Sequence, residues 1–196
     1  MKLIHCADIH LDSPMQTHMT AQQASVRNTE MLQSFVRLTE FAQEHAVRAV
    51  LIAGDLFDGA RVRVRTVDAL LAAIRRTPEV DYLYLPGNHD EAANAFCDCA
   101  LPENLKVFGK TWSSVQYDGI AISGAQLGLD AAFYESLPHT DGAVNLVMLH
   151  GGIGTACGED MINLNLLKNR GIDYLALGHL HTYQTGPLDE TGSYCY

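Results

Sequence analysis

Five short apolar segments of the chain each end in a cluster of histidine, aspartate or asparagine residues. The segments cover residues 2–7, 48–53, 81–85, 143–150 and 173–179. The polar residues at their ends are Asp8, His10, Asp55, Asp58, Asn88, His89, Asp90, His150, His179 and His181. Apolar runs of this length predict buried strands. Ligands of open α/β sheets bind at the carboxyl ends of the strands. We therefore expect an α/β fold whose strands share one polar edge.

Helical patterns separate the first strands. Residues 21–46 carry apolar side chains at steps of three and four, and residues 66–77 form a second amphipathic segment closed by Pro78. The pair Asp118-Gly119 predicts a hairpin, and the pattern of residues 161–171 predicts a last helix that ends at Gly171. This alternation predicts a largely parallel layer with an antiparallel part. Residues 1–196 are expected to form one domain of stacked sheets and flanking helices.

Composition excludes several classes of protein. No apolar run reaches the length of a membrane span, and the early Asp8 argues against a secretory signal. The five cysteines are irregularly spaced, so we expect no disulfide framework and a reducing, cytoplasmic location. The formal net charge of −10 argues against a protein that coats nucleic acid. This negative charge does not exclude a nuclease whose active-site positive charge comes from metal ions.

The spacing of the polar residues favours a metal site. Side chains two apart in an extended chain point the same way, so Asp8 and His10 can reach one site, as can His179 and His181. The candidate ligands are two carboxylates, an amide and four imidazoles: Asp8, His10, Asp55, Asn88, His150, His179 and His181. This mixed set suits manganese, iron or zinc rather than calcium, and lacks the thiolates of a structural zinc site. Seven ligands exceed the need of one tetrahedral ion and fit two octahedral ions with a bridging carboxylate.

The motifs resemble those of the calcineurin-like metallophosphoesterase superfamily. They are Asp8-x-His10, Gly54-Asp55-x-x-Asp58, Gly87-Asn88-His89-Asp90, His150 and Gly178-His179-x-His181, and they span nearly the whole chain. The stretches DIHLDSP, GDLFDG, LPGNHD, LKVFG and LALGHLH are similar to those of SbcD-type DNA-repair exonucleases. That resemblance implies a four-layer α/β/β/α fold with two facing mixed sheets. It also implies two manganese ions, a DNA substrate and an SbcC-like ATPase partner.

The same resemblance implies a role for each site residue. Asp8, His10 and His181 hold the first ion, Asp55 bridges both, and Asn88, His150 and His179 hold the second. Fe²⁺ or Zn²⁺ are alternatives to Mn²⁺. The metals activate water, and His89, oriented by Asp90, gives a proton to the leaving sugar oxygen. The family continues with a DNA-capping region and a segment that docks the ATPase, so we expect the catalytic domain alone here. Helix 21–46 is a candidate homodimer surface, or it packs one face on the core and exposes the other to solvent.

Four further residues carry weaker predictions. Asp58 stands where some relatives have a histidine near the substrate, and we expect it to brace its loop or a metal-bound histidine. Arg61, Arg63 and Arg65 lie on one side of an extended loop. They form either a solvated face or contacts with the phosphate backbone of DNA.

Two other functions remain open on the same motifs. One is hydrolysis of a small phosphodiester or phosphomonoester on the same fold. Serine/threonine phosphatases are disfavoured, because the chain has FDGAR where they need Asp-Arg-Gly. The other is a scaffold without catalysis. The filled ligand positions argue against a scaffold, which would bind no metal tightly.

Overall fold

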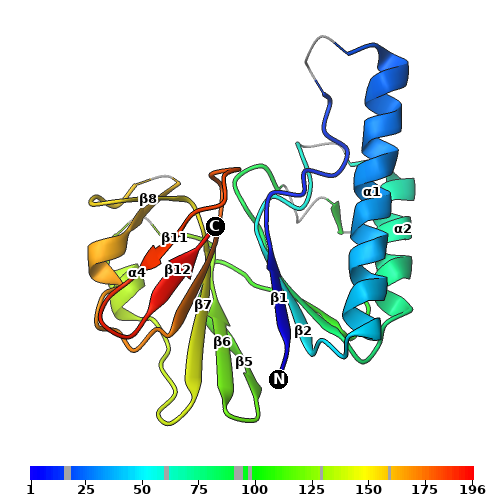
Figure 1. Ribbon diagram of the computed structural model, residues 1–196. Helices are drawn as coiled ribbons and strands as arrows, with labels where there is room; N and C mark the ends of the chain where they lie inside the picture. Colours follow the sequence, from blue (N-terminus) through cyan, green and yellow to red (C-terminus); the bar gives the residue numbers. More distant parts are fainter. Residues whose placement is uncertain (16–18, 60–61, 91–94, 97–98, 129, 159) are drawn as a thin grey trace.

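Two facing β-sheets lie between outer layers in the computed structural model (Figure 1). The structure describes residues 1–15, 19–59, 62–90, 95–96, 99–128, 130–158 and 160–196. Helices α1 (Ala21–Glu44) and α2 (Val64–Arg75) cover one side, and α4 (Ala131–Glu135) with the 3₁₀ turn η1 (Leu164–Leu166) lies on the other. The predicted four-layer α/β/β/α fold is confirmed.

The four-stranded sheet is parallel throughout, where a mixed sheet was expected. Its strands are β1 (Leu3–Cys6), β2 (Ala49–Ala53), β3 (Asp81–Leu85) and β4 (Leu105–Val107), in that order. Helices α1 and α2 connect the first three strands. Along β2, Val50 and Ile52 pack towards the helices, whereas Leu51 faces the other sheet. Both faces are buried, which explains why the strands appear in the sequence as continuous apolar runs.

The six-stranded sheet is mixed. Its order is β11 (Thr185–Pro187), β12 (Ser193–Cys195), β10 (Tyr174–Gly178), β7 (Val144–His150), β6 (Ile120–Gly124) and β5 (Ser113–Tyr117). The four inner strands run parallel and the two edge strands antiparallel. The hairpin at Asp118-Gly119 is confirmed, and Gly119 has the positive φ of +71° that favours glycine. Strands β8 (Gly152–Gly154) and β9 (Met161–Asn163) form a separate pair.

The predicted helix over residues 161–171 is wrong. This segment begins as β9 and continues as η1, a single 3₁₀ turn. The Asn163 side chain accepts the backbone N–H of Asn165 at 3.1 Å, and this local bond competes with helical hydrogen bonding. Ile162 and Leu167 are fully buried against the six-stranded sheet. The apolar spacing therefore reflects burial of a turn rather than of a helix face.

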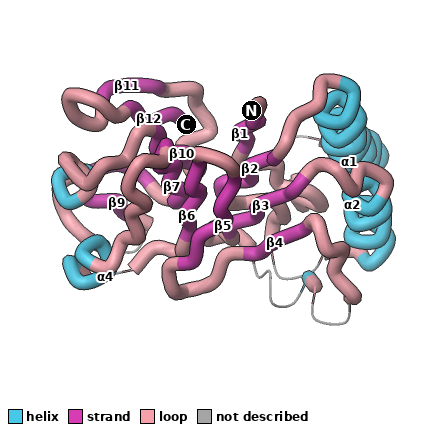
Figure 2. Tube along the Cα trace, turned by 90° about the horizontal axis from the view of Figure 1, so that it is seen from below, coloured by secondary structure: helices cyan, strands magenta, loops and turns pink. Residues whose placement is uncertain are grey.

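The two sheets face each other (Figure 2), and a shared apolar cluster packs between them. It includes Leu51, Leu83 and Leu85 from the four-stranded sheet, and Ile122 and Met148 from the six-stranded sheet. The arrangement places the carboxyl ends of β1, β2, β3, β7 and β10 around one site. Within the described residues, none of the helices has the length and apolarity needed to cross a membrane.

Candidate metal centre

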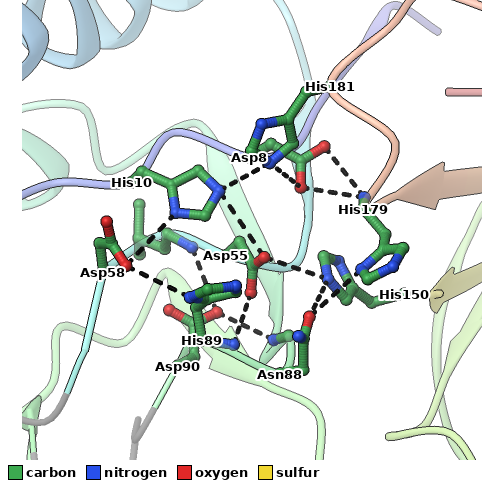
Figure 3. Close-up of polar contacts among 12 residues, drawn as sticks. Asp8, His10, Asp55, Asp58, Asn88, His89, Asp90, His150, His179 and His181 are labelled. Atoms are coloured by element: carbon green, nitrogen blue, oxygen red, sulfur yellow. Dashed lines mark hydrogen bonds and ion pairs between the residues drawn. The ribbon is translucent and has the colours of Figure 1, made fainter. Parts of the chain in front are cut away.

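Loops at the carboxyl ends of five strands bring ten polar side chains together (Figure 3). The loop after β1 supplies Asp8 and His10, the loop after β2 supplies Asp55 and Asp58, and the loop after β3 supplies Asn88, His89 and Asp90. Strand β7 ends at His150, and the loop after β10 carries His179 and His181. The structure thus gathers all seven predicted ligands, although their part in metal binding stays a prediction.

Strained backbone turns the ligands towards the centre. Positive φ values occur at Asp8 (54°), His10 (49°), Asp55 (51°), His179 (115°) and His181 (42°). Such conformations cost a non-glycine residue about 1–3 kcal/mol and cluster at functional sites. Backbone bonds between loops compensate, because the N–H of Asp8 donates to Gly54 O at 3.0 Å and that of His10 to Asp55 O at 2.9 Å.

Asp55 lies at the middle of the cluster and is only 1% exposed. Its Oδ2 is 3.3 Å from His150 Nε2 and 3.7 Å from His10 Nε2, and its Oδ1 accepts the N–H of His89 at 3.0 Å. Burial raises the pKa of this carboxyl, but hydrogen bonds and charge from His150 outweigh burial, so the pKa is lowered. A Cβ at Gly87 would lie 2.2 Å from Asp55 Oδ1, which explains the glycine of the third motif.

One donor group lies on one side of Asp55. Single donor atoms of Asp8, His10, Asp55 and His181 all lie within 4.8 Å of one another. The Nε2 atoms of His10 and His181 are 2.9 Å apart, and Asp8 Oδ1 is 3.8 Å from His181 Nε2. The N–H of His179 fixes the Asp8 carboxylate at 2.9 and 3.0 Å. Two imidazole nitrogens and two carboxylates facing one point form a set that a divalent cation would balance.

A second donor group lies on the other side. Asn88 Oδ1 is 3.0 Å from His150 Nε2 and 3.3 Å from His179 Nδ1. His150 Nδ1 donates its proton to the carbonyl of Ala53 at 2.9 Å, as the outer nitrogen of a metal-bound histidine usually does. The Nε2 lone pair of His150 then faces oxygen atoms of Asn88 and Asp55. A proton or a metal cation between these three acceptors would relieve their mutual repulsion. Burial lowers the pKa of His150, but Asp55 raises it overall. The residues fit a metal ion.

Asp58, rather than Asp90, is the carboxylate beside the proposed acid His89. The Asp58 Oδ1 lies 3.2 Å from His89 Nδ1, and Ser13 Oγ donates to Asp58 Oδ2 at 2.6 Å. The Asp90 carboxylate instead accepts the backbone N–H groups of Leu56, Phe57 and Gly87 at 3.1, 2.7 and 2.9 Å. The predicted contact of Asp90 with His89 is corrected, because a tight turn directs adjacent side chains differently. Asp90 holds the loops after β2 and β3 together.

Two of the three arginines lie within the described residues, and they take different positions. Arg61 lies outside the described residues. Arg63 is the N-cap of α2, and its guanidinium is paired with the Asp12 carboxylate, with Nε at 2.8 Å. Asp12 also accepts the hydroxyl of Thr66 at 2.9 Å. Arg63 therefore ties the loop after β1 to α2, and Arg65 is exposed on the first turn. The role of Asp12 was not predicted, although this residue stands only two positions after His10 in DIHLDSP.

Several known proteins are similar to this chain in sequence or in fold. The family model described as calcineurin-like phosphoesterase matches residues 1–183. A Bacillus subtilis protein named uncharacterized metallophosphoesterase YhaO is 28% identical over 94% of this chain and 49% of its own length. A Methanopyrus kandleri protein named DNA double-strand break repair protein Mre11 is 25% identical over 92% of this chain and 44% of its own. The chain therefore spans about half the length of the curated relatives it matches.

A solved structure shares the fold. The crystal structure of TT1561 from Thermus thermophilus superposes with a TM-score of 0.59 and covers 98% of this chain and 87% of its own. Its sequence identity is 10%, so the likeness concerns the fold alone.

Proposed function

The chain belongs to the calcineurin-like phosphoesterase family, and we propose that it is a two-metal phosphodiesterase that cleaves DNA. The observation that carries this proposal is the position of Asp55 between two donor groups. One group contains His10, and the other contains His150, at 3.7 and 3.3 Å from the same carboxylate oxygen. A carboxylate with candidate ligands on both sides is an arrangement that would suit two neighbouring ions.

The proposed ion ligands follow the two donor groups. Asp8, His10 and His181 would hold the first ion, Asn88, His150 and His179 would hold the second, and Asp55 would be shared by both. Two divalent ions held at such a site would supply an activated water near neutral pH and positive charge for the phosphate oxygens. Mixed imidazole, amide and carboxylate donors support Mn²⁺, and Fe²⁺ or Zn²⁺ would use the same atoms.

His89 is the proposed proton donor to the leaving group. A sugar alkoxide is a poor leaving group, and a positioned histidine can supply the proton it needs. Asp58 accepts from Nδ1 of His89, which leaves Nε2 for a substrate. The side chain is half exposed, so a bound diester can reach it. The backbone N–H of His89 binds the Asp55 carboxylate at 3.0 Å, so acid and metal site are coupled through one loop.

Two observations support DNA as the substrate. The motifs are similar to those of SbcD-type exonucleases. In addition, two archaeal relatives carry the name DNA double-strand break repair protein Mre11. The proposal includes an SbcC-like ATPase as partner and a homodimer through α1, whose Val26 is 52% exposed. A small-molecule phosphodiesterase is the second candidate, because the formal net charge is −10 and Asp12 already pairs with Arg63.

Cleavage of end-labelled linear DNA in Mn²⁺ tests the proposal, with bis(p-nitrophenyl) phosphate as a parallel substrate. We expect the wild type to cleave both, and His89→Ala to lose DNA cleavage with a smaller loss on the aryl diester, because p-nitrophenolate leaves without a proton. Cleavage of the aryl diester alone would favour the small-molecule enzyme. A wild-type protein that binds metal and cleaves neither substrate would contradict the proposed phosphodiesterase.

A further inference from the structure

A pocket of about 670 Å³ adjoins the metal centre on the side of Asp8 and His181. We call it the aromatic pocket, and it is formed by β1, β10, β12 and the loop that follows His181. Its lining includes His5, Asp8, Tyr174, His181, Tyr183 and Tyr196. Asp8 and His181 also belong to the first donor group. A phosphate bound at that group would therefore have the aromatic pocket beside it, with space for one of its ester substituents.

Two walls of the aromatic pocket are fixed by hydrogen bonds. His5 Nδ1 lies 2.9 Å from the hydroxyl of Tyr174, and His5 Nε2 lies 3.1 Å from the carbonyl of Leu177. The Tyr196 hydroxyl donates to Gly151 O at 2.7 Å. Because these hydroxyl groups are already engaged, the two tyrosines present preorganised walls, which lowers the entropic cost of binding.

Tyr183 differs from these walls because it is 80% exposed, the highest value among the large hydrophobic side chains that the structure describes. It stands two residues after His181, at the mouth of the aromatic pocket. An aromatic ring left in solvent beside a charged site can stack on a flat ring of a bound ligand. Nucleobases stack on tyrosine without sequence preference, because every base has a π-face.

We propose that the aromatic pocket holds the nucleoside attached to the scissile phosphate and that Tyr183 stacks on its base. This inference rests on the proposed phosphodiesterase function and narrows its substrate class to nucleoside diesters. Bases inside a duplex are already stacked on both sides, so the pocket favours frayed or single-stranded ends. Recognition of the nucleoside then depends on an aromatic contact rather than on basic side chains, of which this chain has 13 against 23 acidic ones.

Three chromogenic diesters with the same p-nitrophenolate leaving group provide the test. The other ester group is methyl, thymidine through its 5′ oxygen, or thymidine through its 3′ oxygen. We expect the wild type to prefer one thymidyl ester over the methyl ester by about 10- to 100-fold in kcat/KM, mainly through KM. Tyr183→Ala should reduce that ratio to about 1, and Tyr183→Phe should preserve it. Val144→Ala, which shortens an exposed apolar side chain at the start of β7, is the control.

The outcomes separate the pocket from the proposed function. Equal ratios in the wild type and Tyr183→Ala, or no preference in the wild type, would overturn the role of Tyr183. Failure of the wild type to hydrolyse any diester would instead overturn the phosphodiesterase function. Saturation-transfer NMR with adenosine on metal-free protein then tests the pocket without catalysis. Transfer to base protons in the wild type that is lost in Tyr183→Ala supports the pocket, and equal transfer contradicts it.

Discussion

The four-stranded sheet supplies Asp8, Asp55 and Asn88 to the donor groups together with one imidazole, whereas the six-stranded sheet supplies three imidazoles alone. The helices that cover the two sheets differ as well. Helices α1 and α2, of 24 and 12 residues, cover the first sheet, whereas α4 has five residues and η1 three. Both carboxylate ligands thus come from the half with the longer helices, and the other half supplies neutral imidazoles alone.

The loops of the two halves are also held in different ways. In the first half, backbone bonds join the loops after β1 and β2, including Leu11 N–H to Leu56 O at 2.9 Å. In the second half, the loop after β10 is fixed by a carboxylate of the first, because the His179 N–H binds Asp8. Each donor group includes residues from both halves. We therefore expect bound ions to hold the two sheets together as well as to support catalysis.

Replacing the shared carboxylate should have the largest effect. Asp55→Asn removes the charge that both donor groups use. Loss of a residue that merely orients a ligand lowers metal affinity about 10- to 100-fold, so we expect a larger loss here and no detectable diester hydrolysis. Metal per chain and kcat/KM measure both effects. Asp68→Asn, at an exposed site on α2, is the matched control, and a variant that keeps two ions and full turnover would refute the shared role of Asp55.

His89→Ala should separate chemistry from metal binding. Losing a positioned acid lowers kcat by about 10²- to 10⁴-fold on DNA, whose leaving sugar oxygen needs a proton. The donor atoms of both groups remain, so metal content should match the wild type. His139→Ala, which removes an exposed histidine from the other half, should leave both quantities unchanged. If metal content fell together with activity, the proposal that Asn88 binds metal while His89 only donates a proton would be wrong.

Removing metal should weaken the association of the two halves. A ligand that binds only the folded chain, at 100 times its Kd, adds about 2.7 kcal/mol to the free energy of unfolding. We expect Mn²⁺ to raise the urea midpoint relative to protein in chelator. The same addition should have little effect on Asp55→Asn. Equal midpoints for the wild type with and without Mn²⁺ would show that the ions do not join the halves.

A second link between the sheets, away from the metal centre, should affect stability alone. The Tyr117 hydroxyl of β5 donates to Asp81 Oδ2 of β3 at 2.7 Å, and Arg48 lies 3.1 Å from the same oxygen. Tyr117→Phe should lower the free energy of unfolding by about 1–2 kcal/mol, because a bond to a buried charged group is lost. Diester hydrolysis should not change. Tyr183→Phe removes a hydroxyl that is exposed to solvent and serves as the stability control. If Tyr117→Phe and Tyr183→Phe were equally stable, the bond between Tyr117 and Asp81 would not stabilise the fold.

The smallest expected effect depends on pH and lies in the second half. Asp189 accepts the N–H groups of Gly192, Asn169 and Thr191, which lower its pKa from 3.8 to about 2. Because the folded-state pKa is lower, the carboxylate contributes stability above about pH 4 that is lost as pH falls towards 2. The urea midpoint of metal-free Asp189→Asn should therefore lie below the wild type at pH 7 and approach it at pH 3.

A matched acidic residue controls for general charge effects at low pH. Asp118→Asn changes an exposed aspartate at the β5–β6 turn and should leave the midpoint close to the wild type at both pH values. A gap between Asp189→Asn and the wild type that stays constant from pH 7 to pH 3 would show that ionisation of Asp189 is not its source.

The strands and the ligand residues could be predicted because both depend on local pattern. An apolar run such as residues 81–85 predicts a buried strand, and parallel strands bring their carboxyl ends to one edge. The segment after Asp160 could not be predicted in the same way. Its apolar spacing is that of a helix, yet Asn163 caps a 3₁₀ turn and tertiary burial fixes Ile162.

Contacts between residues far apart along the chain also could not be predicted from the sequence. Arg63 pairs with Asp12, which is 51 residues away, so the prediction of a free cationic face had no local signal against it. The sequence could not decide whether Asp58 or Asp90 is the partner of His89. Asp90 is adjacent along the chain, whereas Asp58 is adjacent only in the folded structure. Tyr183 had no motif of its own, and its exposure beside His181 is visible only in the folded chain.

Titration of Mn²⁺ into metal-free protein, with diester hydrolysis followed at each step, tests most directly whether Asp55 joins two ions. We predict two tight ions per chain and turnover that rises with the second. The electron paramagnetic resonance spectrum should then show two coupled ions. Full turnover with a single ion, or two bound ions without coupling or hydrolysis, would contradict a shared metal centre between the sheets.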